Sequence, residues 1–533
     1  MPRSIFDAYV SGGAREFFAG AFASAADRRR AVERAERPLE APVLAALAAQ
    51  NARFAPSDAR SAQLAALAEG AAAVVTGQQV GLFLGPLYTV YKAATAIRAA
   101  QALATESGRP VVPVFWLQTE DHDLPEIASC AIPRAQQEPL TLRMACPPEN
   151  RVSVAHVALP DEISACHATL EAELGKLPHA RVHLERLARH YRPGAGYADA
   201  FAGLLAELFE PEGLILIDPR DPALAPATAA VHRRALDSAQ ALSQALLERS
   251  AALERAGFAA AVHVRADAPL SFFHPGGGQA PRHRLVRGEQ GFAEVGGEGT
   301  HTRDGLLAAL ERDPLCFSTS ALLRPIVQDT LLPTAVYVGG PGEIAYLAQL
   351  GPLYEAFGLQ PPLVLPRARL RVVEAGTARL LERLGLDSAR AEQGEDVLLA
   401  ELARTGAADP APLTPEAFER TLADGFERVL AQAVGALPPL GDQLQAALEK
   451  TRANVRMAAS KLAEKYAGVL ARRDEGRVQE LQRLRTLLQP GGVPQERFYG
   501  LPYFAARYGE RAFLERVLSA IEPFDPTPRE LRP

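Results

Sequence analysis

Residues 71–92 read AAAVVTGQQVGLFLGPLYTVYK, and this stretch decides the fold class. Its first half is a short apolar run ended by Gly77, which is typical of a strand buried in a parallel sheet. Its second half predicts a helix opened by Gly85 and Pro86, because glycine can cap a helix and proline suits its first position. Another apolar run, RPVVPVFWLQ at 109–118, follows that helix. Strand, helix and strand in this order form a βαβ unit and predict an α/β fold with a parallel-sheet core.

A second segment with the pattern of a parallel-sheet core follows further along the chain. TAVYVGG at 334–340 predicts a strand, 342–357 a helix and PPLVLP at 361–366 the next strand. The text between the two core segments mixes helices, a strand in GLILIDPRDP, and the loop HPGGGQAPRHRL leading into short antiparallel strands. We therefore expect a split core, with residues 1–150 as its first part, 151–312 as a connecting insertion and 313–370 as its second part.

The C-terminal third is predicted to be helical. Leu448, Val455, Leu462 and Val469 lie seven residues apart, which indicates a coiled-coil hairpin within residues 371–490. Such a hairpin is suited to forming a homodimer, and ordinary helix packing within one chain is the alternative. The aromatic tail, residues 491–533, is expected to pack back on the body.

Composition excludes several classes of protein. The 533 residues are 48% hydrophobic and 23% charged, with a formal net charge of −6, so the chain lacks the basic footprint of a nucleic-acid or anionic-membrane binder. The sequence contains no run of about 18 apolar residues, so no membrane span is predicted. The four cysteines are scattered without a CxxC pair, which indicates reduced thiols and a cytoplasmic protein.

The first candidate site is the glycine-rich segment between the first predicted strand and helix. Backbone N–H groups at a helix start favour a phosphate or carboxylate, and Tyr88 and Lys92 share one helix face there. A plain turn with glycines for tight packing is the alternative. The candidate binding residues of this segment are Gly77, Gln78, Gln79, Gly81, Gly85, Pro86, Tyr88 and Lys92.

The second candidate site is Glu120-Asp121-His122-Asp123, directly after the second predicted strand. Ligands bind at the carboxyl ends of strands in open α/β sheets, so these four residues are predicted to be catalytic. These residues could act as a general base, or they could bind an ammonium group. The alternative is a helix-capping aspartate with exposed neighbours. No second ligand cluster accompanies them, so no metal ligand is assigned and the metal state is left open.

A third group follows the later strands. Gly340, Glu343 and Tyr346 lie at the next strand-to-helix junction, and Arg367 follows the last strand. The polar residues Arg324, Gln328 and Asp329 interrupt an apolar stretch, and they are either satisfied core groups or ligand contacts.

Together these motifs resemble the BshC family, the cysteine ligase of bacillithiol biosynthesis. The matching segments are TGQQVGLFLGPLYTVYK, PVFWLQTEDHD, RPIVQDTLLPTAVYVGGPGEIAY and PLVLPR, in order from about residue 70 to 370. The resemblance implies a Rossmann-type core like that of class I aminoacyl-tRNA synthetases, connecting insertions and a homodimer through a C-terminal coiled coil. It also implies addition of cysteine to glucosaminyl-malate, and binding of ATP or ADP. The Gly81–Pro86 segment lacks the HIGH histidine signature of those synthetases.

The hypothesis is therefore a ligase in which the glycine segment and Lys92 hold an anion, while Glu120 to Asp123 orient the cysteine ammonium group or act as base. Two alternatives stay open: a non-catalytic nucleotide- or thiol-binding dimer that assists a separate ligase, and a structural coiled-coil dimer.

Overall fold

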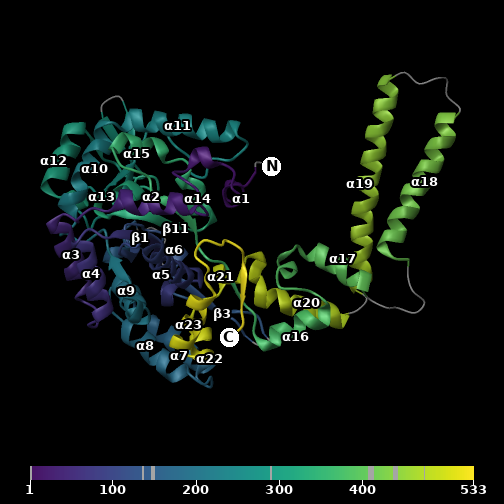
Figure 1. Ribbon diagram of the computed structural model, residues 1–533, viewed down its shortest axis with the longest axis horizontal. Helices are drawn as coiled ribbons and strands as arrows, with labels where there is room; N and C mark the ends of the chain where they lie inside the picture. Colours follow the sequence, from purple (N-terminus) through teal and green to yellow (C-terminus); the bar gives the residue numbers. More distant parts are fainter. Residues whose placement is uncertain are drawn as a thin grey trace. The chain divides into compact units, whose positions relative to one another are not determined.

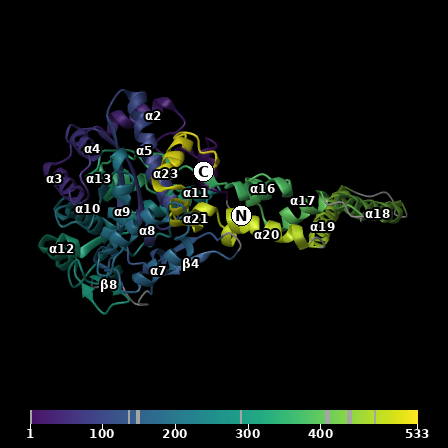
Figure 2. The same ribbon diagram turned by 90° about the horizontal axis from the view of Figure 1, so that it is seen from below.

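The computed structural model describes residues 3–134, 137–145, 151–288, 291–405, 413–435, 442–472 and 475–533. These residues fall into two compact units. The first lies within Met1–Pro133, Leu140–Leu370 and Glu496–Leu531, and the second within Arg134–Pro139, Arg371–Gln495 and Arg532–Pro533. Figures 1 and 2 show the elements of each.

A five-stranded parallel sheet forms the centre of the first unit, and it confirms the predicted fold class. Its strand order is β12-β11-β1-β2-β5. The strands are β1 (Ala72–Gln79), β2 (Val111–Gln118), β5 (Ile215–Ile217), β11 (Thr334–Gly339) and β12 (Leu363–Pro366). The chain builds outward from β1 to β5 on one side, then returns to place β11 against the other side of β1. A crevice therefore opens at the carboxyl ends of β1 and β11, where the strand order reverses.

Helices pack around this sheet in the first unit (Figure 1). The longest, α5 (Tyr88–Ser107), packs on β1 and β2 and ends at Gly108, whose φ is 68°. Its predicted start at Gly85 and Pro86 was wrong by two residues, because Pro86 pairs with Gly500 instead of entering the helix. The other helices before the insertion are α1 (Ile5–Val10), α2 (Ala25–Ala35), α3 (Ala41–Asn51), α4 (Asp58–Ala68) and α6 (Leu124–Ile127).

The insertion adds helices and a second, antiparallel sheet of order β10-β6-β7-β8-β9. This confirms the short antiparallel strands expected after the glycine-rich loop. The sheet contains β6 (Ser271–Phe273), β7 (His283–Gly288), β8 (Gly291–Val295), β9 (Thr300–His301) and β10 (Phe317–Thr319). The helices are α7 (Ile163–Leu174), α8 (Ala180–His190), α9 (Tyr197–Leu208), α10 (Ala225–Asp237), α11 (Ala239–Arg255) and α12 (Arg303–Arg312). A two-stranded ribbon joins β3 (Ser129–Ile132) to β4 (Leu140–Arg143).

The returning core segment contains α13 (Arg324–Leu331) before β11. The helix expected over 342–357 is two helices, α14 (Pro341–Leu347) and α15 (Gly351–Phe357). The break falls where Pro352 takes a first-turn position, because proline has no N–H to continue a preceding helix. The tail adds α21 (Gln495–Phe498), α22 (Pro502–Tyr508) and α23 (Glu510–Ala520), and its Tyr499 and Phe504 are buried as predicted.

The second unit is helical, as expected. It contains α16 (Ala375–Leu384), α17 (Glu395–Thr405), α18 (Pro415–Gly435), α19 (Asp442–Arg472) and α20 (Glu475–Leu488). Helices α18 and α19 lie side by side as a hairpin (Figure 1). Residues 436–441, between the two helices in sequence, lie outside the described residues. The buried residues of α19 are Ala459, Ala463, Ala467 and Gly468. In the predicted heptad line, Leu448 and Val455 are half-buried, whereas Leu462 and Val469 are 47% and 51% exposed. The second half of the heptad line therefore faces away from the seam between the two helices.

Candidate active site

A cavity of about 440 Å³ opens at the carboxyl ends of the parallel strands. Strands β1, β2 and β11, helices α5, α13 and α14, and the tail all contribute to its wall. The lining residues with polar side chains are Gln78, Gln79, Tyr88, Lys92, Trp116, Gln118, Asp121, Glu126, Arg324, Tyr337, Glu343, Tyr346, Arg367 and Arg497. Segments distant in sequence thus converge at the point where the strand order reverses.

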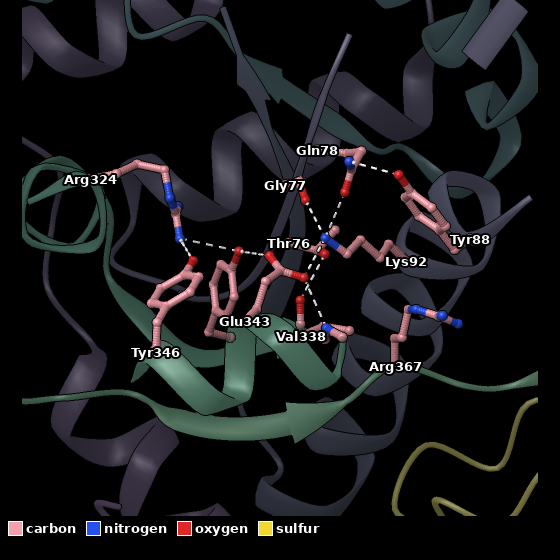
Figure 3. Close-up of polar contacts among 12 residues, drawn as sticks. Thr76, Gly77, Gln78, Tyr88, Lys92, Arg324, Val338, Glu343, Tyr346 and Arg367 are labelled. Carbon is pink, nitrogen blue, oxygen red and sulfur yellow. Dashed lines mark hydrogen bonds and ion pairs between the residues drawn. The ribbon is translucent and has the colours of Figure 1, made fainter. Parts of the chain in front are cut away.

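A buried ion pair crosses the base of this cavity (Figure 3). The ammonium nitrogen of Lys92 lies 2.5 Å from a carboxylate oxygen of Glu343. It also donates to the carbonyl oxygen of Gly77 at 2.8 Å and to the side-chain oxygen of Gln78 at 2.9 Å. Burial lowers the pKa of Lys92 and Glu343 opposes that shift, whereas Lys92 lowers the pKa of Glu343 against the effect of burial. All three donors of Lys92 are therefore used within the protein.

A polar network continues from this pair to Arg324 (Figure 3). Tyr337 donates to Glu343 at 2.6 Å, and its hydroxyl accepts from Arg324 at 3.2 Å. The Arg324 guanidinium also donates to Tyr346 at 2.8 Å and to Gln328 at 2.8 Å. Glu343 also accepts from the backbone N–H at residue 340, where α14 begins. The network fixes Arg324 against the cavity wall.

Asp121 also contributes to the polar lining of the cavity. Its carboxylate accepts from Gln79 at 3.0 Å and from the backbone N–H of His122 at 2.8 Å, and it lies 3.7 Å from a guanidinium nitrogen of Arg282. Gln79 donates to Glu126 as well, at 2.9 Å. Burial raises the pKa of Asp121, but the bonds from His122 and the charge of Arg282 outweigh it and hold that pKa below its usual range. Asp121 is therefore ionised at neutral pH.

Comparison with known proteins shows the family. The model described as "Bacillithiol biosynthesis BshC, N-terminal Rossmann-like domain" matches residues 3–368, and "Bacillithiol biosynthesis BshC, C-terminal coiled-coil domain" matches residues 370–527. The chain belongs to the BshC family. This confirms the resemblance seen in the sequence, including the Rossmann-type core and the C-terminal coiled-coil domain.

Relatives with the name "Putative cysteine ligase BshC" cover most of the chain. The one from Salinibacter ruber is 34% identical over 92% of this chain and 89% of its own length. The one from Koribacter versatilis is 34% identical over 88% and 85%. A solved structure described as "putative arginyl t-RNA synthetase from Campylobacter jejuni" aligns over 86% of this chain and 94% of that one, at 10% identity. Its TM-score of 0.24 is too low to support any comparison of the two structures.

Of the four residues Glu120 to Asp123, only Asp121 lines the cavity. Glu120 is buried and accepts hydrogen bonds from the backbone N–H and the hydroxyl of Thr319, which ties β2 to the insertion. Asp123 is the N-cap of α6, where it accepts from the backbone N–H of Glu126 at 3.3 Å. His122 is partly exposed, with one ring nitrogen 3.4 Å from Asp121. The catalytic roles assigned to Glu120, His122 and Asp123 from sequence stay predictions.

The glycine segment divides in the same way. Gly77, Gln78, Gln79, Tyr88 and Lys92 line the cavity, whereas Gly81, Gly85 and Pro86 are not among its lining residues. Five backbone N–H groups of the loop donate within the protein, at Gly81, Leu84, Gly85, Leu87 and Thr89. The expected anion cradle at the helix start therefore lacks these donors, because turn formation and the tail already use them.

The later candidate residues also divide into those that line the cavity and those that lie behind its lining. Gly340, Glu343, Tyr346 and Arg367 line the cavity. Gln328 and Asp329 lie behind Arg324: Gln328 donates to Asp329 at 2.8 Å, and Tyr354 donates to it at 2.6 Å. They are satisfied core groups, the first of the two alternatives for these residues.

Sequence reasoning assigned no role to three residues that the fold brings to this site. Arg497 lines the cavity, Arg282 lies beside Asp121, and Glu126 accepts a hydrogen bond from Gln79. Arg324, which the sequence placed in a polar run with Gln328 and Asp329, lines the cavity as well. Arg282 comes from the insertion and Arg497 from the tail, so neither is near the end of a parallel-sheet strand in sequence.

No helix in the described ranges is long and apolar enough to cross a membrane. Nor does any group of three or more His, Cys, Asp or Glu side chains suited to a metal ion occur in that part of the chain.

Proposed function

We propose that this chain is a cysteine ligase that joins the carboxyl group of cysteine to the amine of glucosaminyl-malate, which completes bacillithiol. The observation that carries the proposal is a polar cavity at the strand-order reversal, with an ionised Asp121 and two arginines, Arg324 and Arg497, that form no ion pair with a described carboxylate. Both substrates carry an ammonium group and at least one carboxylate, so a wall with both signs of charge suits them. The names of the relatives support the same reaction.

Asp121 is the group that we assign to the substrate amine. A carboxylate with a lowered pKa is a weak base, so it is better suited to accepting hydrogen bonds from an ammonium group than to removing its proton. Gln79 and Arg282 fix the carboxylate from two sides, at 3.0 and 3.7 Å. Orientation of the amine beside the carboxyl carbon is the contribution expected from this geometry.

Activation of the cysteine carboxyl group is a further part of the proposal. Condensation of a free carboxylate with an amine is uphill in water, and we propose ATP as the activator, with ATP or ADP as the bound nucleotide. The loop at 81–89 does not fit as the phosphate cradle, because five of its N–H groups donate within the protein. No step of the reaction is therefore assigned to that loop.

We also propose a homodimer through the coiled-coil unit, in the cytoplasm. Support for the dimer comes from apolar side chains that are exposed along α18 and α19 of a single chain: Val429, Leu444, Met457, Leu462 and Val469. Support for the compartment comes from Cys130, Cys166 and Cys316, which are buried free thiols, while Cys146 lies outside the described residues.

The test is a reconstituted reaction of the purified chain with cysteine, glucosaminyl-malate and ATP, followed by mass spectrometry of the product. Asp121→Asn should lower the rate by about 10²-fold, since it removes the charge that orients the amine. Asp304→Asn is the control, because that side chain is 91% exposed on α12. Binding of all three compounds by the wild type without any bacillithiol would favour a protein that assists a separate ligase.

A further inference from the structure

Arg324 is a buried cation whose bonding within the protein is incomplete. It is 6% exposed and begins α13 at the cavity wall. Its guanidinium makes three hydrogen bonds, to Gln328, Tyr337 and Tyr346, and all three acceptors are neutral. A guanidinium has five N–H donors, so two of them have no described acceptor.

The other buried cations of the cavity are already neutralised. Lys92 is paired with Glu343 at 2.5 Å, and Arg367 is paired with Glu496 at 2.6 Å. Glu343 contacts Arg324 only through the hydroxyl of Tyr337, because its own oxygens are taken up by Lys92, the residue 340 N–H and that hydroxyl. Among the described residues, Arg324 thus has no carboxylate in direct contact, and the charge of Glu343 acts on it only across Tyr337. Two unused donors of a fixed guanidinium at a cavity wall are suited to an anion from outside the chain.

The geometry also separates Arg324 from the other end of the cavity. Figure 3 shows Arg324 and Tyr346 on one side of the Lys92–Glu343 pair, with Tyr88 and Arg367 on the other. The hydroxyl of Tyr346 accepts a hydrogen bond from the Arg324 guanidinium at 2.8 Å, which fixes the orientation of the guanidinium. The planar fork of a fixed guanidinium matches the two oxygens of a carboxylate.

We propose that Arg324 is the binding group for a substrate carboxylate that keeps its charge throughout the reaction. This inference rests on the proposed function. The cysteine carboxyl group loses its charge when it is activated, so a buried guanidinium dedicated to it would stabilise the ground state more than the transition state. The acceptor, in contrast, brings malate carboxylates that take no part in bond formation. Arg324 therefore selects the dicarboxylate part of the amino-sugar acceptor.

The experiment is titration calorimetry of the full-length chain with glucosaminyl-malate, with neither cysteine nor nucleotide present. Arg324→Lys retains the charge but loses the fork, and it should raise the Kd for glucosaminyl-malate by about 10- to 100-fold. The Kd values for cysteine and for ATP should stay within about threefold of wild type. Free glucosamine, which has no carboxylate, should bind the wild type and the variant equally.

Arg220→Lys is the matched control. Arg220 is also a buried arginine with neutral acceptors, the carbonyl oxygens of Phe317 and Gly278, but it does not line the cavity. Its Kd for glucosaminyl-malate should match the wild type. If Arg324→Lys does not fold, Tyr346→Phe takes its place, because it removes one of the acceptors that fix the guanidinium; a Kd about three- to tenfold higher is then expected.

Three results would overturn the assignment: an unchanged Kd in the folded variant, a loss that falls on ATP instead, or a wild type that does not bind glucosaminyl-malate. Failure of the proposed function looks different. A wild type that binds glucosaminyl-malate through Arg324 but forms no amide with cysteine and ATP would keep the binding site and reject the ligase reaction.

Discussion

Lys92→Met tests the buried pair at the base of the cavity. The substitution keeps most of the side-chain volume but removes the ammonium group that is 2.5 Å from Glu343. The Glu343 carboxylate then keeps only two donors, the backbone N–H at residue 340 and the hydroxyl of Tyr337. An uncompensated buried charge of this kind costs about 3–5 kcal/mol of unfolding free energy.

A double-mutant cycle separates the interaction energy of Lys92 and Glu343 from the energy lost when other side-chain contacts are removed. Glu343→Gln alone leaves the ammonium of Lys92 buried with two neutral acceptors and no counter-ion, so it should cost a similar amount. The double variant leaves no buried charge, and we expect it to cost about 1–3 kcal/mol, less than either single change. Lys176→Met, an exposed lysine in the same unit, is the control and should change stability by less than about 0.5 kcal/mol.

The pH dependence has a definite sign. In the wild type the pKa of Glu343 is held below its usual range, so the contribution of the pair is present above that range and is lost as the pH falls through the folded pKa. Without Lys92, burial raises the pKa of Glu343, so the variant gains stability as the pH falls from 7. The difference between wild type and Lys92→Met should therefore shrink between pH 7 and pH 5.

Urea unfolding followed by tryptophan fluorescence measures these quantities for the unit that contains the site. Trp116 is the single tryptophan of the chain, and it is buried in β2 at the cavity wall. Additive losses in the double variant, or a loss below about 1 kcal/mol for Lys92→Met, would refute the view that Lys92 and Glu343 neutralise each other.

Two further predictions concern acid stability and assembly. Burial lowers the pKa to about 3 for three histidines: His183, His232 and His274. Below about pH 6.5 these histidines take up protons in the unfolded chain but not in the folded chain. Each one should therefore lower the free energy of unfolding by about 2 kcal/mol by pH 5, which urea unfolding would detect as a lower midpoint. A midpoint that stays constant from pH 7 to 5 would contradict this. Leu462→Glu with Val469→Glu should halve the mass in sedimentation equilibrium, whereas Lys461→Glu should not, and a wild type with the mass of one chain would reject the proposed dimer.

The fold was predictable because its central strands are continuous apolar runs. Residues 72–75 and 111–117 are buried on both faces of the sheet, so each strand appears in the sequence as an uninterrupted block. The helix α5 between them is long and ends at a glycine. These patterns are local, so they can be interpreted from the sequence without knowledge of the tertiary structure.

The split of EDHD was not predictable, because it depends on partners far away in sequence. Glu120 bonds to Thr319, which arrives in β10 almost 200 residues later, and Asp121 is fixed by Arg282 from the insertion. Alternation along the chain gives opposite faces to neighbouring residues, but it does not say which face meets the cavity. That choice is made by the insertion, whose position no periodicity specifies.

The glycines of the first motif show how one pattern has two causes. A Cβ at Gly77 would lie 2.8 Å from the carbonyl oxygen of Trp116, so this glycine is required for the close approach of β1 and β2. Gly81 and Gly85 similarly pack against each other, since a Cβ at Gly81 would be 3.0 Å from the Cα of Gly85. These glycines serve packing, which the sequence held open as the alternative to ligand approach.

The charges of the site lead to the same conclusion from another direction. Lys92 is the conspicuous cation of the motif, yet all three of its donors are used by the protein, and its role is to hold Glu343 and the end of β1 in place. Arg324 is less conspicuous in sequence, yet it keeps unused donors at the cavity wall. A cation that is saturated within the fold stabilises a site, whereas one that is buried but unsaturated can recognise a ligand. By that criterion the binding of an anion moves from the glycine segment to α13, and Lys92 becomes the support on which the Tyr337–Arg324 network rests.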